Sequence, residues 1–492
     1  MDTSRSILQS AKRFFAGTFL SRISGLLREI AMAFAFGTSP AVAAFMVAYR
    51  LANLFRRLLG EGNLQSGFAP HFESLYAQNP KAALQFYRDV SFSLLALLLV
   101  ITVGMEGGLA LGASYFNESW QEVARLAMWM APGLIFICLY GLNAALLQCK
   151  KQYFLTGVAP VAFNFVWIAF ACFARNMEML SMGITLGFCL QWLLTSLQVR
   201  KEIFAHLTLQ EWLSPQIFST SWKRLMKSLS LGILGVGAMQ INSACDAIFA
   251  RFADLSGPTY LWYAIRVYQL PLALFGIALS GALLPPLARA MQSGSKERYM
   301  ELLRGSLRQS AALMVPCTFA LFVLGESGLK LLYQHGQFSE ESLPQTLHCL
   351  WGYGLGLVPA VFVLLLANGF YARKSYAIPV IASVSAVAVN LFLNALFVFV
   401  LHWGAVSIAI ATSVSSFCNV GILSYCLSKE LGAIHCWGLL GKLVVCSALI
   451  GIVVTQIGGG FFLQAPLYLA GVLGLARWMK VAELQELLRN GL

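Results

Sequence analysis

Residues 14–36 read FFAGTFLSRISGLLREIAMAFAF, an apolar stretch long enough to cross a bilayer as a single helix. The same stretch contains Arg22, Arg28 and Glu29. A charged side chain at the centre of a membrane costs about 2.5–3.5 kcal/mol on insertion scales, so it normally faces a polar cavity and marks a transport pathway. These residues therefore predict a membrane protein with cationic groups in its interior.

The composition of the whole chain agrees with this class. Of its 492 residues, 58% are hydrophobic and 11% are charged, and the mean hydropathy is +0.72. A soluble globular protein carries about 25% charged residues. The segment before Arg13 is short, polar and basic, so we expect no cleavable signal peptide. The chain is expected to be an all-α polytopic membrane protein.

Windows of about 20 apolar residues predict fourteen transmembrane helices. Their approximate ranges are 14–36, 41–64, 88–112, 123–148, 155–174, 179–199, 228–252, 260–285, 306–330, 345–370, 377–400, 404–427, 438–457 and 461–479. Lys and Arg occur in every second loop, whereas the opposite loops carry mainly Glu. By the positive-inside rule, both termini are expected in the cytoplasm. The net charge of +13 is spread over these loops, so it does not indicate nucleic-acid binding.

Two similar segments indicate an internal duplication. Residues 50–70 (RLANLFRRLLGEGNLQSGFAP) and 266–286 (RVYQLPLALFGIALSGALLPP) both begin with Arg and end with Pro. Corresponding segments in two six-helix halves are typical of transporters whose site lies between the halves. The domains expected are an N-terminal lobe (1–200), a cytoplasmic connection (201–227), a C-terminal lobe (228–428), and two further helices with a tail (429–492).

The sequence lacks the motifs of most enzymes and pumps. It has no G-x-x-x-x-G-K-[ST] loop, no G-x-S-x-G or H-E-x-x-H motif, and no C-x-x-C pair among its eleven cysteines. General acid–base or nucleophilic catalysis needs a positioned reactive group, and none stands out. We expect a protein that is not an enzyme and needs no organic cofactor.

Cationic residues are the main candidate site. On the second predicted helix, Arg50 and Arg57 are seven residues apart and share a face with Asn53. Arg266 occupies the equivalent repeat position to Arg50. A guanidinium group binds phosphate through two parallel hydrogen bonds, so these residues predict a site for a diphosphate. The alternatives are ion pairs with Glu29 and Glu61, or snorkelling of residues such as Arg57 to the head groups.

A second polar group lies in the later helices, namely Asp246, Asn390, Asn394 and Thr412, with Asn242 beside Asp246. One carboxylate with amide and hydroxyl oxygens is a suitable ligand set for a hard cation such as sodium. On the residues alone, ordinary hydrogen bonding between helices explains this group better.

Four segments resemble the MurJ/MviN lipid II flippases of the multidrug/oligosaccharidyl-lipid/polysaccharide exporter superfamily. They are residues 21–37 (SRISGLLREIAMAFAFG), 53–70 (NLFRRLLGEGNLQSGFAP), 332–338 (LYQHGQF) and 368–380 (NGFYARKSYAIPV). The resemblance implies fourteen helices, with two six-helix lobes in a V around a central cationic cavity and two C-terminal helices that form a groove for the lipid tail. It also implies transport of lipid II, the undecaprenyl-diphosphate-linked disaccharide-pentapeptide, by alternating access.

The resemblance places the functional arginines at Arg22, Arg28, Arg56 and Arg266, with Arg57 beside them. Arg50 then matches a commonly basic position. Family members with a sodium site hold it at the positions of Asp246, Asn390, Asn394 and Thr412. This chain departs from the family at several acidic positions, where it has uncharged residues: Ala43, Ala44, Ile265, Gln269 and Asn394. These departures weaken the case for ion coupling more than the case for the anion site.

The sequence therefore predicts a lipid II flippase for peptidoglycan biosynthesis, and hence for cell-wall biogenesis and cell shape, in the bacterial cytoplasmic (inner) membrane. We expect it to contact lipid II and membrane lipids, to work as a monomer, and to lie near cell-wall synthesis proteins. One alternative is a flippase for another polyprenyl-diphosphate-linked oligosaccharide. A multidrug exporter or a membrane enzyme acting on polyprenyl phosphates fits less well, because acidic and histidine-rich clusters are missing.

Overall fold

A computed structural model describes residues 4–60, 63–432, 437–479 and 483 of the chain. Within these residues the regular structure is α-helical, with two short π-helical segments and no strand. The expected all-α class is therefore confirmed. The helices form two compact units, Met1–Ala247 and Ile248–Leu492.

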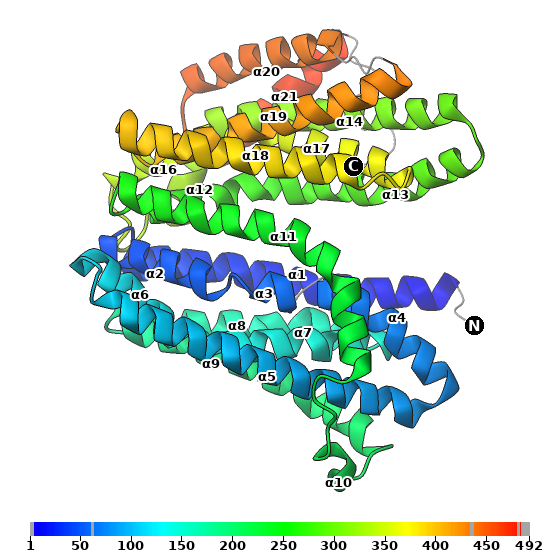
Figure 1. The fold of residues 1–492 in the computed structure, drawn as a ribbon. Coiled ribbons are helices and arrows are strands. Elements are labelled where there is room, and N and C mark those ends of the chain that lie inside the picture. Colours follow the sequence, from blue (N-terminus) through cyan, green and yellow to red (C-terminus); the bar gives the residue numbers. More distant parts are fainter. Residues whose placement is uncertain (1–3, 61–62, 433–436, 480–482, 484–492) are drawn as a thin grey trace. The chain divides into compact units, whose positions relative to one another are not determined.

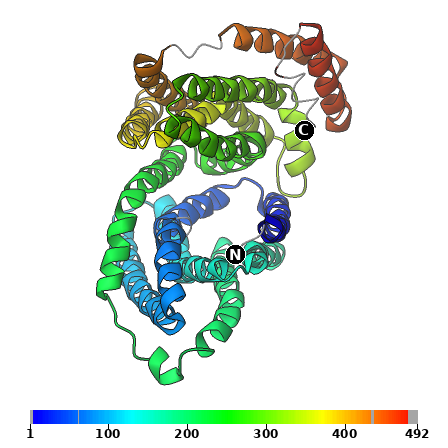
Figure 2. The same cartoon turned by 90° about the vertical axis from the view of Figure 1, so that its right-hand side faces the viewer.

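The first unit is a bundle in which α1 packs along α8, α9 packs against α7 and α8, and α2 packs against α6. Its long helices α1, α8 and α9 run side by side in Figure 1, and Figure 2 shows all the helices of this unit turned by 90°. They are α1 (Ser4–Phe36), α2 (Pro40–Ala52), α3 (Arg56–Leu59), α4 (Asn63–Gln78), α5 (Pro80–Ala113), α6 (Glu118–Met130), α7 (Gly133–Cys149), α8 (Tyr153–Phe173), α9 (Met177–Phe204), α10 (Leu209–Trp212) and most of α11 (Thr220–Ala253).

In the second unit α19 packs against α16, α17 and α18, and α14 packs against α17 and α20. The last helix, α21, lies against α20. The elements are α12 (Gly257–Pro271), η1 (Leu272–Gly276), α13 (Ile277–Gln292), α14 (Lys296–Val323), α15 (Gly325–Tyr333), α16 (Ser342–Gly354), α17 (Leu357–Ala372), α18 (Ala377–Ala395), η2 (Leu396–Val400), α19 (Val406–Leu431), α20 (Trp437–Ile457) and α21 (Phe461–Trp478).

Length and composition identify membrane-crossing helices among the described residues. Ten helices qualify, or eleven if α6 and α7, bent by 42°, form one span. Three of the fourteen predicted ranges are not among these candidate spans. They coincide with α1, with α2 to α4, and with α11. The chain is a multi-pass membrane protein, and the number fourteen stays a prediction.

The second predicted span, 41–64, is broken rather than continuous. Helix α2 ends at Ala52, Asn53 caps it, and the one-turn helix α3 follows before α4 begins. The break packs tightly on α7: a Cβ atom on Gly141 would lie 2.4 Å from the carbonyl oxygen of Gly60. Glycine at both positions therefore permits the close approach of the two backbones. The expectation that Arg50, Asn53 and Arg57 share one helical face is wrong, because the helix ends between them.

The second repeat copy also departs from a regular helix soon after its arginine. Helix α12 ends at Pro271, and the π-helix η1 follows before α13 resumes. Proline lacks the backbone N–H that a continuous α-helix needs, which explains a change of hydrogen-bond pattern here.

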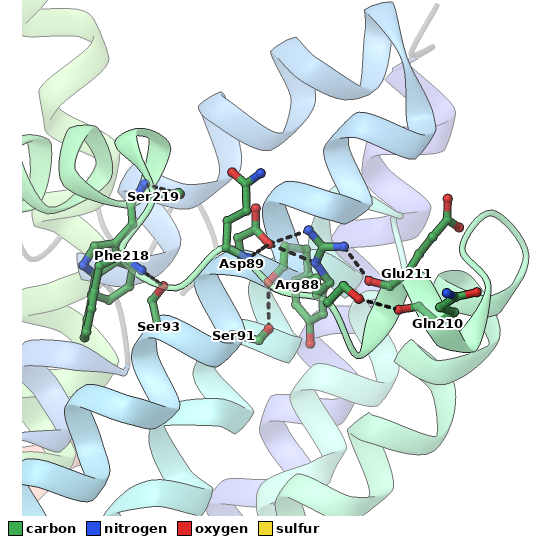
Figure 3. A network of polar contacts seen from close by, with 12 residues as sticks. Arg88, Asp89, Ser91, Ser93, Gln210, Glu211, Phe218 and Ser219 are labelled. Carbon is green, nitrogen blue, oxygen red and sulfur yellow. Dashed lines mark hydrogen bonds and ion pairs between the residues drawn. The ribbon is translucent and has the colours of Figure 1, made fainter.

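The segment between α9 and α11 is held to the start of α5. Helix α9 continues through Phe204, so the segment comprises residues 205–219 and carries α10. The Arg88 guanidinium donates to the carbonyl oxygen of Glu211 and to Oδ1 of Asp89 (Figure 3). Asp89 Oδ1 also accepts from the backbone N–H of Gln216 at 2.9 Å. These contacts hold residues 205–219 against the first unit. The predicted domain boundaries at residues 200, 227 and 428 stay predictions.

Candidate functional site: cationic residues on two halves

Arg28 has polar and aromatic partners on two helices. It lies on α1 with its side chain 12% exposed, and it forms an ion pair with the neighbouring Glu29, which is buried. Its Nη1 donates to Oδ1 of Asn164 on α8 at 2.9 Å. Its Cζ lies 4.5 Å from the centroid of the Trp167 ring. The guanidinium is thus held by an acid, an amide and an aromatic face.

Asn164 ties Arg28 to the packing of α1 on α8. Its Nδ2 donates to Oγ of Ser24 at 2.8 Å and to the carbonyl oxygen of Ser21 at 3.2 Å. Asn164 is buried, so all three hydrogen bonds lie in an environment that strengthens them. Neither Asn164 nor Trp167 was among the predicted site residues. Their contacts with Arg28 join helices far apart in the sequence, which no spacing rule reveals.

The other predicted cations of the first unit differ in their surroundings. Arg22 is exposed on α1. Arg50 is half-buried, and its Nη1 donates to the carbonyl oxygen of Ser243 on α11 at 3.0 Å. This hydrogen bond links α2 to α11 and gives Arg50 a structural role. The resemblance likewise places Arg50 at a commonly basic position and not among the functional arginines.

The short helix α3 carries Arg56 and Arg57. The Cζ atom of Arg56 lies 5.8 Å from the centroid of the Phe188 ring on α9. The side chain of Arg57 and the entire residue Glu61 lie outside the described part of the structure. Their predicted roles stay predictions. Asn53 donates from Nδ2 to the carbonyl oxygen of Tyr49 at 2.8 Å, a bond within its own helix end.

In the second unit, Arg266 is half-buried on α12. Its Cζ atom lies 4.3 Å from the centroid of the Trp262 ring, one helical turn earlier. Arg28 and Arg266 therefore share an arrangement in which a tryptophan face supports the guanidinium. A cation over an aromatic face gains about 0.5–1 kcal/mol at an exposed site and more when desolvated. The four-residue spacing makes this contact visible in the sequence, although it was not predicted.

The candidate sodium ligands fall in both units. In the first, Asn242 Nδ2 lies 3.4 Å from Oδ2 of the buried Asp246. In the second, Asn394 donates to Oδ1 of Asn390 at 2.9 Å, and Asn390 lies 3.4 Å from Oγ1 of Thr412. The two amides and the hydroxyl thus contact one another across α18 and α19, an arrangement typical of polar side chains between membrane helices. Their oxygens are also hard donors that would suit sodium, so the ion stays a hypothesis.

The chemistry that these residues offer is anion binding. Guanidinium groups supply fixed positive charge and paired N–H donors that match phosphate oxygens. Within the described residues, no cluster of three or more His, Cys, Asp or Glu could hold a metal ion.

Comparisons with known proteins identify the family. The profile described as "Lipid II flippase MurJ" matches residues 32–465. A protein of Chlamydia trachomatis serovar D, named "Probable lipid II flippase MurJ", is 32% identical over 528 residues, covering 99% of this chain and 97% of that relative. The chain belongs to the MurJ family. The resemblance noted in the four sequence segments is thereby confirmed.

Solved structures agree on the fold of the MurJ family and its superfamily. The structure titled "Lipid II flippase MurJ, inward closed conformation" matches with a TM-score of 0.80 at 22% identity, covering 95% of this chain and 98% of that chain. An inward-facing multidrug transporter of the MATE family, in the MOP superfamily, matches with a TM-score of 0.70 at 12% identity over 84% and 95% of the two chains. The MurJ family consists of transporters. The expectation that this chain is a transporter rather than an enzyme agrees with the role of its family.

Proposed function

We propose that the chain is a flippase that moves lipid II from the inner to the outer leaflet of the cytoplasmic membrane. The observation that carries this proposal is the match to MurJ proteins along 99% of the chain, at 97% coverage of the relative. The match therefore spans nearly the whole length of both chains.

The substrate contacts are proposed to be made by arginines of both halves. Arg22, Arg28, Arg56 and Arg57 would bind the diphosphate from the first half, and Arg266 from the second. Support comes from the arrangement of Arg28 and Arg266, each over a tryptophan ring at 4.5 and 4.3 Å. A guanidinium held in this way has fewer rotamers to lose when a ligand binds, which favours binding.

Glu29 gives the site a further property. Because Arg28 already pairs with Glu29, a diphosphate must compete with this carboxylate for the guanidinium. Such competition weakens binding, and a transporter needs a substrate affinity weak enough for release on the far side. The net positive charge that attracts the diphosphate would then come from the arginines together rather than from Arg28 alone.

The location, orientation and partners form part of the same proposal. The chain would lie in the bacterial inner membrane with both termini in the cytoplasm, and it would work as a monomer close to cell-wall synthesis proteins. Lipid II and membrane lipids are its expected ligands. A sodium ion at Asp246, Asn390, Asn394 and Thr412 is the one inorganic cofactor that the resemblance suggests.

Energy for net movement would come from the membrane potential. A diphosphate carries about two negative charges, and each is worth about 2.3 kcal/mol per 100 mV across the membrane. An interior-negative potential therefore favours outward movement of the anionic lipid. The same field would draw the empty cationic site back towards the cytoplasm.

The alternatives differ in substrate or in chemistry. A flippase for another polyprenyl-diphosphate-linked oligosaccharide would use the same arginines, so the two differ in head-group selectivity. A membrane enzyme would change the lipid itself. Incubating the purified chain with lipid II in vesicles separates these classes: a flippase leaves lipid II chemically intact, and formation of a new product would overturn the proposal.

A further inference from the structure

A pocket of about 310 Å³ lies within the first unit, apart from the cationic residues described above. Its walls come from α5, α7 and α9, and α10 contributes Trp212. Pockets of about 300–1,000 Å³ hold small ligands, and this one is near the lower end of that range. Its size suits one alkyl chain rather than a whole lipid.

The walls of the pocket are mainly apolar, with one cation. Phe92, Leu95 and Trp192 are half-buried lining residues from two helices that qualify as membrane spans. Among the described lining residues the single charged side chain is Arg200, which is exposed and lies with its Cζ 5.9 Å from the centroid of the Phe204 ring. An apolar chamber with one guanidinium in its lining matches an amphiphile with an anionic head.

The pocket is open to the surface that a membrane would cover. Leu193 and Leu197, which flank the lining positions on α9, are 44% and 55% exposed. Exposed leucines on a membrane span face lipid rather than water. A lipid chain can therefore reach the pocket from the bilayer without passing through the protein interior.

The segment between α9 and α11 closes one end of the pocket. The Trp212 ring lies 5.5 Å from the ring of Phe92 and 6.3 Å from that of Tyr87. Its neighbour Glu211 pairs with Lys81, and this pair lowers the pKa of the Glu211 carboxyl to about 2, so the carboxylate is charged at neutral pH. Together with the Arg88 and Asp89 contacts (Figure 3), the pair keeps Trp212 over the pocket.

We propose that this pocket binds one acyl chain of an anionic membrane phospholipid, with the phosphate of its head group held by Arg200. The bound chain packs against Trp212 and so stabilises the docking of residues 205–219 on the first unit. The site does not depend on which lipid the protein transports.

The test uses the full chain in phosphatidylcholine vesicles with a phosphatidylglycerol probe that carries a photoreactive diazirine on one acyl chain. Crosslinks are mapped by mass spectrometry. They are expected on the stretches of α5 and α9 that line the pocket. Leu95→Trp fills the chamber and Arg200→Gln removes the cation, and each is expected to lower the yield there by about tenfold, a factor that corresponds to about 1.4 kcal/mol of binding free energy.

Matched controls are Leu99→Trp, one turn along α5 at an exposed position, and Lys201→Gln, the exposed neighbour of Arg200. Both should keep the full yield. Equal yields in all four variants would mean that the probe reports surrounding bilayer lipid, and would overturn the proposal. An equal yield from a phosphatidylcholine probe would overturn the role of Arg200. Displacement of the probe by undecaprenyl phosphate would assign the pocket to a polyprenyl chain instead. Arg200 is exposed, so its variant keeps the test valid even if Leu95→Trp misfolds.

Discussion

The Oδ1 atom of Asn164 accepts a hydrogen bond of 2.9 Å from Nη1 of Arg28, while the Nδ2 atom of the same amide donates to α1. One side chain of α8 thus sets both the packing of α1 and the direction of its guanidinium. In this account Asn164 is a positioning residue: it acts on the substrate through Arg28.

The first prediction follows from that relationship. Asn164→Leu should lower transport more strongly than it lowers protein abundance, because a hydrogen bond to a charged group is worth about 1.5–3 kcal/mol. Ser24→Ala removes a single anchoring bond of Asn164 and should have a milder effect. Ser310→Ala, a buried serine bonded to its own helix, is the control and should be neutral. Complementation and immunoblotting measure the two quantities, and an equal loss of both would reduce Asn164 to a packing role.

The second prediction concerns the arginines themselves. Arg28→Ala and Arg266→Ala should each abolish complementation of a depletion strain at near-normal abundance. Lysine should rescue partly, because an ammonium lacks the paired N–H donors of a guanidinium. Arg175→Ala, at an exposed position between α8 and α9, should be tolerated. The cationic-site account is wrong if both alanine variants complement fully.

The third prediction tests the break after α2. Gly141→Ala places a methyl group 2.4 Å from the Gly60 carbonyl oxygen, so backbone must move. Overpacking of this kind costs about 1–3 kcal/mol, and it should shift α3 together with Arg56. Gly104→Ala meets nothing within 4 Å and should be neutral or slightly stabilising. Thermal unfolding in detergent compares the two; equal melting temperatures would argue against the close approach.

The fourth prediction separates the potential from sodium. Collapsing the membrane potential should arrest flipping, because about two substrate charges cross the field. Replacing sodium at constant potential, or substituting Asp246→Asn, should slow it at most, since the chain has uncharged residues (Ala43, Ile265, Gln269 and Asn394) at positions where acids are common in the family. A flux assay with ionophores measures this. Complete loss of transport without sodium, at an intact potential, would instead establish a cation site around Asp246.

Much of the fold could be predicted from sequence because the apolar windows and their breaks are local properties. The positions of α5, α8 and α9 follow from such windows and from caps such as Asn79 and Asn176, whose side chains accept from the first backbone N–H groups. The end of α2 at Ala52 was missed. The close packing of Gly60 on Gly141 after this break joins residues far apart in the chain, which no local pattern reveals.

The site was predictable to a similar extent. Charge in an apolar window identifies Arg28 and Arg266 as candidates, and the spacing from Trp262 to Arg266 is a local signal. The partners Asn164 and Trp167 depend on the register of α1 against α8, which is a tertiary property. The ion pair of Arg28 with Glu29, in contrast, joins neighbours in the sequence and is a local contact.

The most direct test of the central claim is the sidedness of lipid II after the chain is depleted from the bacterium that makes it. Lipid II should accumulate, and its head group should become inaccessible to an externally added enzyme that cleaves lipid II. Re-expression of the intact chain should restore cleavage, and the Arg28→Ala variant should not. An unchanged externally cleavable fraction after depletion would contradict the account.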